Sequence, residues 1–172
     1  LVVDTALGIL RMTVIYGIVE HGDPEAPARR GRQLAEELGD EENRAELCSL
    51  HGLIISSRGP EAFPVGQALI EEGLAIAERA GLQLAAIRIA RMLAWSYLFD
   101  GRFADALGRI DRVLADFDRL GTEGKQRDIY LGALFMRDRI HFHSDEIDEA
   151  LSLARRTYEA AVVHPNRTVQ SG

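Results

Sequence analysis

The residues in this sequence best suited to covalent chemistry are Cys48 and His51, which lie about one helical turn apart. A thiol and an imidazole at that spacing can act as a nucleophile and its general base. However, Cys48 holds the place in the chain's repeating pattern that Ala90 holds in the next repeat. A small buried residue is expected there, so the pattern favours a packing role for Cys48.

A second cluster, His141-Phe-His143-Ser-Asp145, contains residue types that bind metal ions. Two helical residues separated by two positions point about 200° apart, so the two histidines cannot readily share one ion. The acids that follow, Asp145, Glu146, Asp148 and Glu149, are typical of a helix N-terminus, where the helix dipole favours negative charge. We therefore predict a helix end here, with no metal ion and no other cofactor.

The segment Gly121-Thr-Glu-Gly-Lys125 has a faint likeness to a phosphate-binding loop. It lacks the preceding apolar strand, the glycine spacing and the Ser or Thr after lysine that such a loop uses to hold phosphate and magnesium. A turn between helices is the better interpretation. Because no candidate forms a catalytic constellation, we expect that this chain is not an enzyme; an independent enzyme on a helical scaffold is the weakest alternative.

Composition limits the class of protein further. The chain has 172 residues, 47% of them hydrophobic, and a formal net charge of -7. It can bury a sizeable core, whereas a general nucleic-acid binder would concentrate positive charge on one face. A single cysteine suits a reducing compartment, and no run reaches the roughly 18 uncharged residues of a membrane-spanning helix. We predict a cytoplasmic protein without direct nucleic-acid or membrane contact.

Helical patterning dominates the elements that must position these residues. Over 82–99, apolar residues recur in steps of three and four, which is one face of a helix, and short Gly, Pro or Asp breaks separate similar runs. The fold class predicted is all-α. The predicted helices are 2–20, 25–38, 42–57, 62–80, 82–99, 103–120, 125–143 and 146–163.

The helix ends repeat at a regular interval. Gly39, Gly81 and Gly121 each follow a similar run of apolar and charged residues, and glycine suits a helix end that closes in the left-handed conformation. A period of about 40 residues with two helices per unit is typical of an α-solenoid. We predict one domain over 1–164, built from about four antiparallel helix pairs at 1–40, 41–81, 82–121 and 122–164. A flexible tail over 165–172 follows, and the sequence reads as a piece of a longer protein.

The third unit carries a recognisable motif. Ala94, Tyr97, Gly101 and Ala106 give a small residue, an aromatic, a turn glycine and an alanine in that order, and Phe103 follows the glycine. This order resembles the tetratricopeptide repeat (TPR), and the resemblance implies a right-handed superhelix in which Gly101 turns the chain and Ala106 lies where two helices cross.

The other units match this motif less well. In the second unit the first three places are held by Gly52, Ile55 and Gly59, whereas Pro64 replaces the alanine. Pro60 and Pro64 predict a longer turn, with Gly66 or Ala68 taking over the crossing. In the fourth unit Ala150 is kept, whereas Asp145 replaces the glycine and His141 the aromatic.

The longer period and the AERAGL-like helix ends are similar to the repeats of large bacterial signalling ATPases. These include transcription regulators of the maltose-activator type and ATPase-linked adenylyl cyclases. The resemblance implies a protein-interaction or regulatory segment of such a bacterial signal-transduction protein. Its partner would be a protein, a peptide or another domain of the same chain, and exposed repeat ends leave a homodimer open.

The resemblance also implies a binding surface, because the first helix of each TPR unit lines a concave groove where partner peptides lie. The residues carried over to this groove are Tyr16, Ser49, Leu53, Arg88, Arg91, Trp95, Leu98, Phe135 and Arg139. Arg and Trp are enriched in binding hot spots. Two alternatives stay open: Trp95 packs between units while the arginines are solvated, or the groove or a pocket between repeats senses a small molecule.

Overall fold

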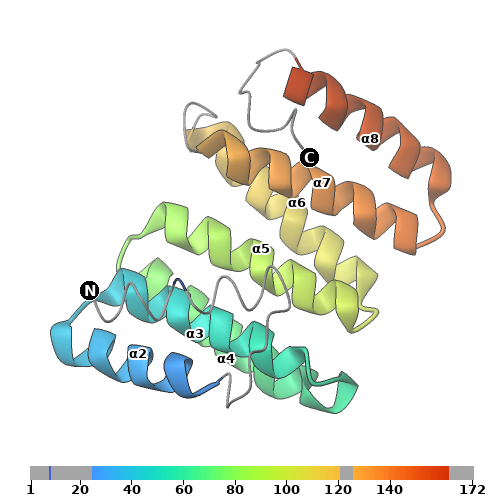
Figure 1. The fold of residues 1–172 in the computed structure, drawn as a ribbon. Coiled ribbons are helices and arrows are strands. Elements are labelled where there is room, and N and C mark those ends of the chain that lie inside the picture. The colour runs from blue at the N-terminus through green and yellow to red at the C-terminus, as the bar shows by residue number, and fades with distance from the viewer. Residues whose placement is uncertain (1–7, 9–24, 121–125, 163–172) are drawn as a thin grey trace. The chain divides into compact units, whose positions relative to one another are not determined.

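The computed structural model of the chain describes residues 8, 25–120 and 126–162. These residues form α2 (Glu25–Leu38), α3 (Glu41–Ser56), α4 (Phe63–Arg79), α5 (Gln83–Phe99), α6 (Phe103–Leu120), α7 (Gln126–His143) and α8 (Ile147–Val162), with a 3-10 turn, η1 (Pro60–Ala62), before α4 (Figure 1). No strand occurs in the described part of the chain, so the all-α prediction is confirmed there.

The predicted helix bounds agree with the observed ones to within one residue at every described end. Three sequence expectations lie outside the described residues: the helix predicted over 2–20, the turn over 121–125 and the tail over 165–172. The division into units of about 40 residues stays a prediction.

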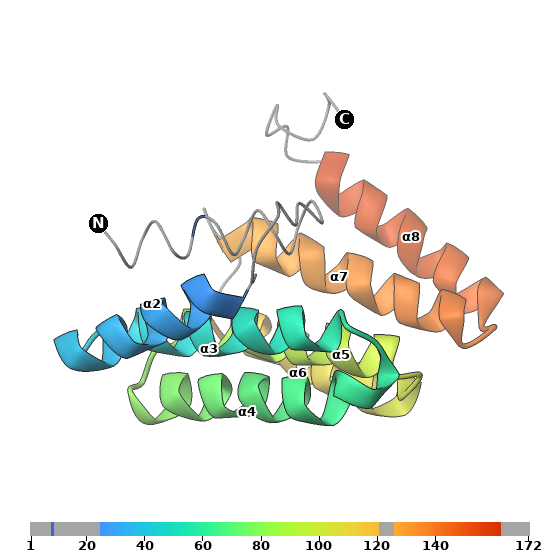
Figure 2. The same cartoon turned by 60° about the horizontal axis from the view of Figure 1, so that its bottom comes forward.

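The chain packs as two compact units, residues 1–102 and 103–172, and each is described by itself. In the first unit α3 is the central helix, in contact with α2, α4 and α5, while α4 also contacts α5. In the second unit α7 lies between α6 and α8 and contacts both. Within each unit, helices joined by short turns run in opposite directions, as Figures 1 and 2 show.

Four helices end in the same hydrogen-bonded motif. Gly39, Gly81 and Gly101 have φ of 67°, 69° and 73°, and Asp145 has φ of 61°. At Gly101 the amide donates to the Leu98 carbonyl and the next amide, of Arg102, donates to the Tyr97 carbonyl at 2.9 Å, which is the Schellman arrangement. The predicted left-handed helix ends are confirmed at Gly39 and Gly81, whereas the one predicted at Gly121 lies outside the described residues. Gly101, predicted as a turn residue, adopts the same conformation. Asp145 adopts the same conformation where it replaces the motif's glycine.

Helices α3 and α4 approach so closely that their backbones touch. A Cβ on Gly66 would lie 2.5 Å from the Gly52 carbonyl oxygen, and one on Gly73 would lie 2.6 Å from that of Ala45. Of the two residues expected to take over the crossing in the second unit, Gly66 is confirmed, whereas Ala68 is wrong because it is exposed. The longer turn predicted from Pro60 is also confirmed, since η1 occupies it.

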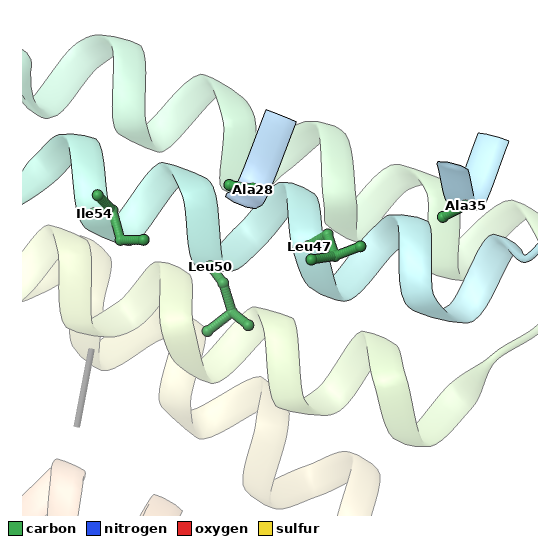
Figure 3. Close-up of a cluster of buried hydrophobic side chains, with 5 residues drawn as sticks. All are labelled: Ala28, Ala35, Leu47, Leu50 and Ile54. Atoms are coloured by element: carbon green, nitrogen blue, oxygen red, sulfur yellow. The ribbon is translucent and has the colours of Figure 1, made fainter. Parts of the chain in front are cut away.

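The core of the first unit begins where α2 lies along α3 (Figure 3). Its buried members are Ala28, Ala35, Leu47, Leu50 and Ile54, with Leu34 and Met92 partly buried against them. Asp40 immediately precedes α3, and its side chain caps the helix by accepting from the Asn43 amide at 3.2 Å. The small residues on α2, Ala28 and Ala35, are fully buried where this helix packs on α3.

The motif residues of the third predicted repeat lie at buried positions or at a turn, and the repeat itself stays a prediction. Ala94, Tyr97 and Ala106 are all buried, and Gly101 turns the chain after α5. Helix α5 is buried on more than one face, because it packs on both α3 and α4. The single apolar face predicted for this helix therefore understates how much of it is buried.

Candidate functional site

The candidate site lies on α5. Arg88, Arg91 and Trp95 follow one another at three- and four-residue steps, which places them on one side of the helix. The Trp95 ring stacks on that of Phe99, with centroids 5.4 Å apart and planes at 24°. Phe99 is 64% exposed, so the stacked pair presents an aromatic surface at the C-terminal end of α5. Phe99 was not predicted as a site residue, although it lies four residues beyond Trp95 on the same side.

Arg88 connects α5 to α3. Its Nη2 lies 3.0 Å from an Oε1 of Glu42 and 3.7 Å from Oε2 of Glu46. The Glu46 side chain is only 7% exposed, so a nearby positive charge offsets much of the cost of burying its carboxylate. The Arg88 guanidinium is thus already paired with carboxylates of the protein itself.

Arg91 is in a different situation. Its Nε is buried and has no hydrogen-bond partner among the residues that the structure describes. Burial lowers the pKa of the Arg91 guanidinium, and the neighbouring charge of Arg88 lowers it further. A guanidinium stays charged at neutral pH even so. Arg91 is therefore a desolvated cation, within the described chain, to which no carboxylate is paired.

Two residues predicted for the groove are in the core instead. Ser49 is fully buried and its hydroxyl donates to the Glu46 carbonyl at 2.8 Å, while Leu98 is also buried. The physical reason is that each of these helices packs on more than one neighbour, α3 on α2, α4 and α5 and α5 on α3 and α4, so more of each helix is covered than a single buried face would be. Leu53 is half-buried. Neither Ser49 nor Leu98 offers its side chain to a partner.

Two further residues predicted for the groove lie on α7. Phe135 and Arg139 belong to the second unit, on α7, where the Arg139 guanidinium carbon lies 5.8 Å from the centroid of the half-exposed Phe135 ring. Tyr16 lies outside the described residues. A groove that runs across all the first helices stays a prediction, whereas the α5 residues form a local surface.

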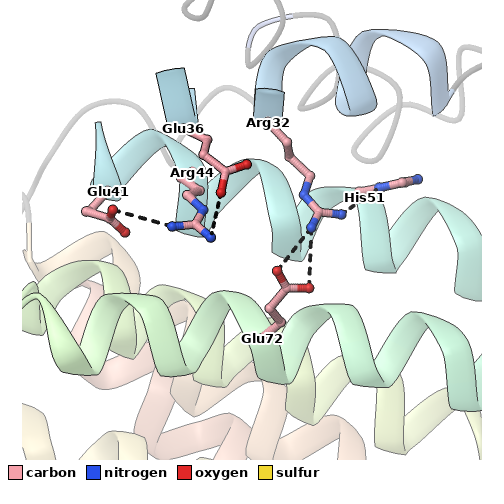
Figure 4. A network of polar contacts seen from close by, with 6 residues as sticks. All are labelled: Arg32, Glu36, Glu41, Arg44, His51 and Glu72. Carbon is pink, nitrogen blue, oxygen red and sulfur yellow. Dashed lines mark hydrogen bonds and ion pairs between the residues drawn. The ribbon is translucent and has the colours of Figure 1, made fainter. Parts of the chain in front are cut away.

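A partly buried polar network joins α2, α3 and α4 in the first unit (Figure 4). The Arg32 guanidinium donates to both oxygens of Glu72, at 3.1 and 3.3 Å, and reaches the Nδ1 of His51 at 3.4 Å. Because a guanidinium has only donors, Nδ1 acts as the acceptor, and His51 Nε2–H then donates to Glu25, 3.2 Å away. Both imidazole nitrogens are thus occupied.

Cys48 takes no part in a nucleophile–base pair within this network. The residue is fully buried, and desolvation raises the pKa of its thiol to about 12, so the thiol stays protonated at neutral pH. The His51 nitrogens are held by Arg32 and Glu25. The expectation that Cys48 fills a small core position is confirmed.

The histidines on α7 do not meet. His141 is buried and its Nδ1 contacts the Glu146 carboxylate, whereas His143 is exposed at the end of the helix. No group of three or more His, Cys, Asp or Glu side chains in the described ranges is arranged to hold a metal ion. The helix end predicted at Asp145 is confirmed.

No protein-family model matches the chain, and no curated protein matches it in sequence. None of the helices in the described segments has the length and apolar character needed to cross a membrane.

Proposed function

We propose that this chain is a TPR-like helical-repeat domain that binds a protein or peptide through the α5 surface formed by Arg91, Trp95 and Phe99. The observation that carries the proposal is the half-buried guanidinium of Arg91, whose Nε is buried without a hydrogen-bond partner in the described residues and which lies on the same side of α5 as a stacked aromatic pair. A carboxylate that reaches Arg91 replaces its lost hydration with a charge-assisted hydrogen bond.

The solenoid part of the proposal rests on how the first unit packs. Helix α3 contacts the helix before it, the helix after it and also α5, the first helix of the next predicted pair. That order of contacts is what stacked helix pairs require, since each pair must cover the apolar face of its neighbour. The recurring Schellman turns at Gly39, Gly81 and Gly101 also support a solenoid of stacked helix pairs.

The geometry favours one class of partner. Arg91 would form an ion pair with an acidic group of the partner. The Trp95–Phe99 surface would pack against an apolar or aromatic side chain beside that group. The preferred ligand is therefore a peptide with Asp or Glu next to an aromatic or aliphatic residue. In the bacterial signalling proteins that the repeats resemble, such a segment would belong to a regulatory partner or to another domain of the parent chain.

The test is selection of peptides from a random library on the wild-type chain, followed by fluorescence-anisotropy titration of the selected sequences. We expect enriched acidic–apolar pairs whose binding weakens as salt rises, because the contact is partly ionic. Arg91→Met should lose most of this affinity. Arg30→Met, which removes an exposed arginine on α2, is the matched control and should bind like wild type. Equal affinity in both variants would contradict the proposal.

The alternative function is sensing of a small-molecule effector. It is favoured by the same Arg91, which has no carboxylate partner among the described residues, since a small carboxylate or phosphate would also pair with it. A thermal-shift screen of acidic metabolites separates the two functions, because only a sensor is stabilised by a free small ligand.

A further inference from the structure

The last described helix, α8, leaves an apolar stripe uncovered. Ile147, Leu151, Tyr158 and Val162 are 44%, 65%, 69% and 56% exposed. With the exposed Ala154 they recur in steps of four, three, four and four along the helix. Scattered apolar residues are ordinary on a protein surface, but a continuous stripe over four helical turns is typical of an interaction site.

The stripe is not the side of α8 that packs within the second unit. Ala150 and Leu153 are buried, and α7 is the helix that α8 contacts in the second unit. The exposed residues therefore form a second apolar face on the same helix. A repeat of alternating three- and four-residue steps is the pattern by which one helix packs along another.

We infer that α8 pairs through this face with α8 of a second copy of this chain, antiparallel about a two-fold axis. Closed two-fold dimers are the commonest arrangement of identical chains, and they need a self-complementary surface. When the axis passes between Ser152 and Leu153, Leu151 lies opposite Ala154 of the second copy. In these central layers a large residue therefore meets a small one. Ile147 then lies opposite Tyr158 of the second copy.

The charges beside the stripe select this register. Asp148 and Arg155 are seven residues apart, so both lie along the same edge of the stripe. In the proposed register Asp148 of one copy is about two residues, or roughly 3 Å along the axis, from Arg155 of the other. The two-fold axis makes this opposite-charge contact twice. Moving the axis to the middle of the stripe, between Ala154 and Arg155, would instead place the two Arg155 side chains against each other.

The expected dimer is weak. Its interface is one helix face of 16 residues, about 24 Å long, which is small for a permanent complex. We expect a dissociation constant on the order of 10–100 µM, so that the dimer forms and dissociates over an accessible concentration range.

Sedimentation velocity of the whole 172-residue chain, from roughly 5 µM to 1 mM, tests the proposal. Wild type should pass from monomer to dimer over this range, and Leu151→Asp should remain monomeric. Ser152→Asp, an exposed neighbour on another side of the helix, should dimerise like wild type. Circular dichroism checks that each variant keeps its helical content.

A charge exchange tests the register itself. Asp148→Arg and Arg155→Asp should each weaken the dimer about tenfold, because each turns two attractive contacts into repulsive ones. The double variant should recover most of the wild-type affinity. Glu149→Arg and Arg156→Asp are controls on α8 that make the same changes of charge outside the stripe, and they should have little effect.

Three results would overturn the inference. One is a chain that stays monomeric throughout, as expected if a different protein covers α8. Another is a dimer that persists in Leu151→Asp, which would place the interface elsewhere. The third is a charge-exchanged variant that dimerises no better than the single variants, which would exclude the antiparallel register.

Discussion

Replacing Arg91 by methionine should make the protein more stable while it removes the proposed binding function. Arg91 has a buried Nε with no partner in the described chain, and the Arg88 charge beside it disfavours a second cation. Methionine keeps the apolar stem and removes the desolvated charge. Replacing a buried ion pair by apolar side chains of similar volume is often neutral or stabilising by about 1–4 kcal/mol, and a desolvated cation without a carboxylate partner in the described chain should follow the same trend. Because Arg91 is partly exposed, we expect the lower part of this range, about 1 kcal/mol.

The same substitution at Arg88 should have the opposite effect on stability. Arg88 pairs with Glu42 and with the buried carboxylate of Glu46. Its removal takes one positive charge away from the neighbourhood of the buried Glu46 carboxylate, at a cost of about 1–2 kcal/mol. In the Arg88→Met background, Arg91→Met should stabilise the protein less than it does in wild type, because the repulsion between the two arginines is already gone.

Urea unfolding followed by circular dichroism at 222 nm measures all four proteins: wild type, both single variants and the double variant. A change of 1 kcal/mol corresponds to about 2–4 °C in melting temperature for a chain of this size. The m-value should not change, since none of the variants alters how much surface unfolding exposes. A loss of stability in Arg91→Met would refute the reasoning, because it would mean that the guanidinium has a stabilising partner.

Three further predictions concern packing and pH. Gly52→Ala should destabilise the protein by about 1–3 kcal/mol, because the added Cβ would overlap the Gly66 carbonyl oxygen. Gly108→Ala on α6 is the control: it has open space around it and should raise stability by about 0.5–1 kcal/mol in the same unfolding assay. Ala106→Leu should also cost about 1–3 kcal/mol, since Ala106 is fully buried; an unchanged melting temperature would show that the position is not packed. The raised pKa of Cys48, about 12, contributes stability that is present below the unfolded thiol pKa of about 8.5 and is lost as pH rises toward 12. Wild type should therefore lose more unfolding free energy above pH 9 than Cys48→Ala does, and equal losses would contradict the assignment.

The sequence predicts the helix bounds well because the residues at each helix end determine where the helix stops or starts. Gly39, Gly81 and Gly101 end helices in the left-handed conformation, and Asp40 caps the next helix with its own carboxylate. These signals act over a few residues, so they are readable without knowing the fold.

The candidate site is less predictable because burial depends on distant contacts. Ser49 and Leu98 have the spacing of groove residues, but both are buried on helices that pack on several neighbours, which helix periodicity alone does not indicate. Arg88 and Arg91 look equivalent in the sequence. Only the position of Glu42 and Glu46 on α3 makes one of them paired and leaves the other without a carboxylate in the described chain.

The most direct test of the proposed binding surface uses the chain's single tryptophan, Trp95. Its emission reports on the aromatic pair beside Arg91 without any added label. A library-selected acidic–apolar peptide that lacks tryptophan should shift the Trp95 emission to shorter wavelength and saturate at the same dissociation constant as the anisotropy titration. The shift should disappear in Arg91→Met and persist in Arg30→Met. Binding by anisotropy with no change in Trp95 emission would place the peptide elsewhere on the protein and contradict the account.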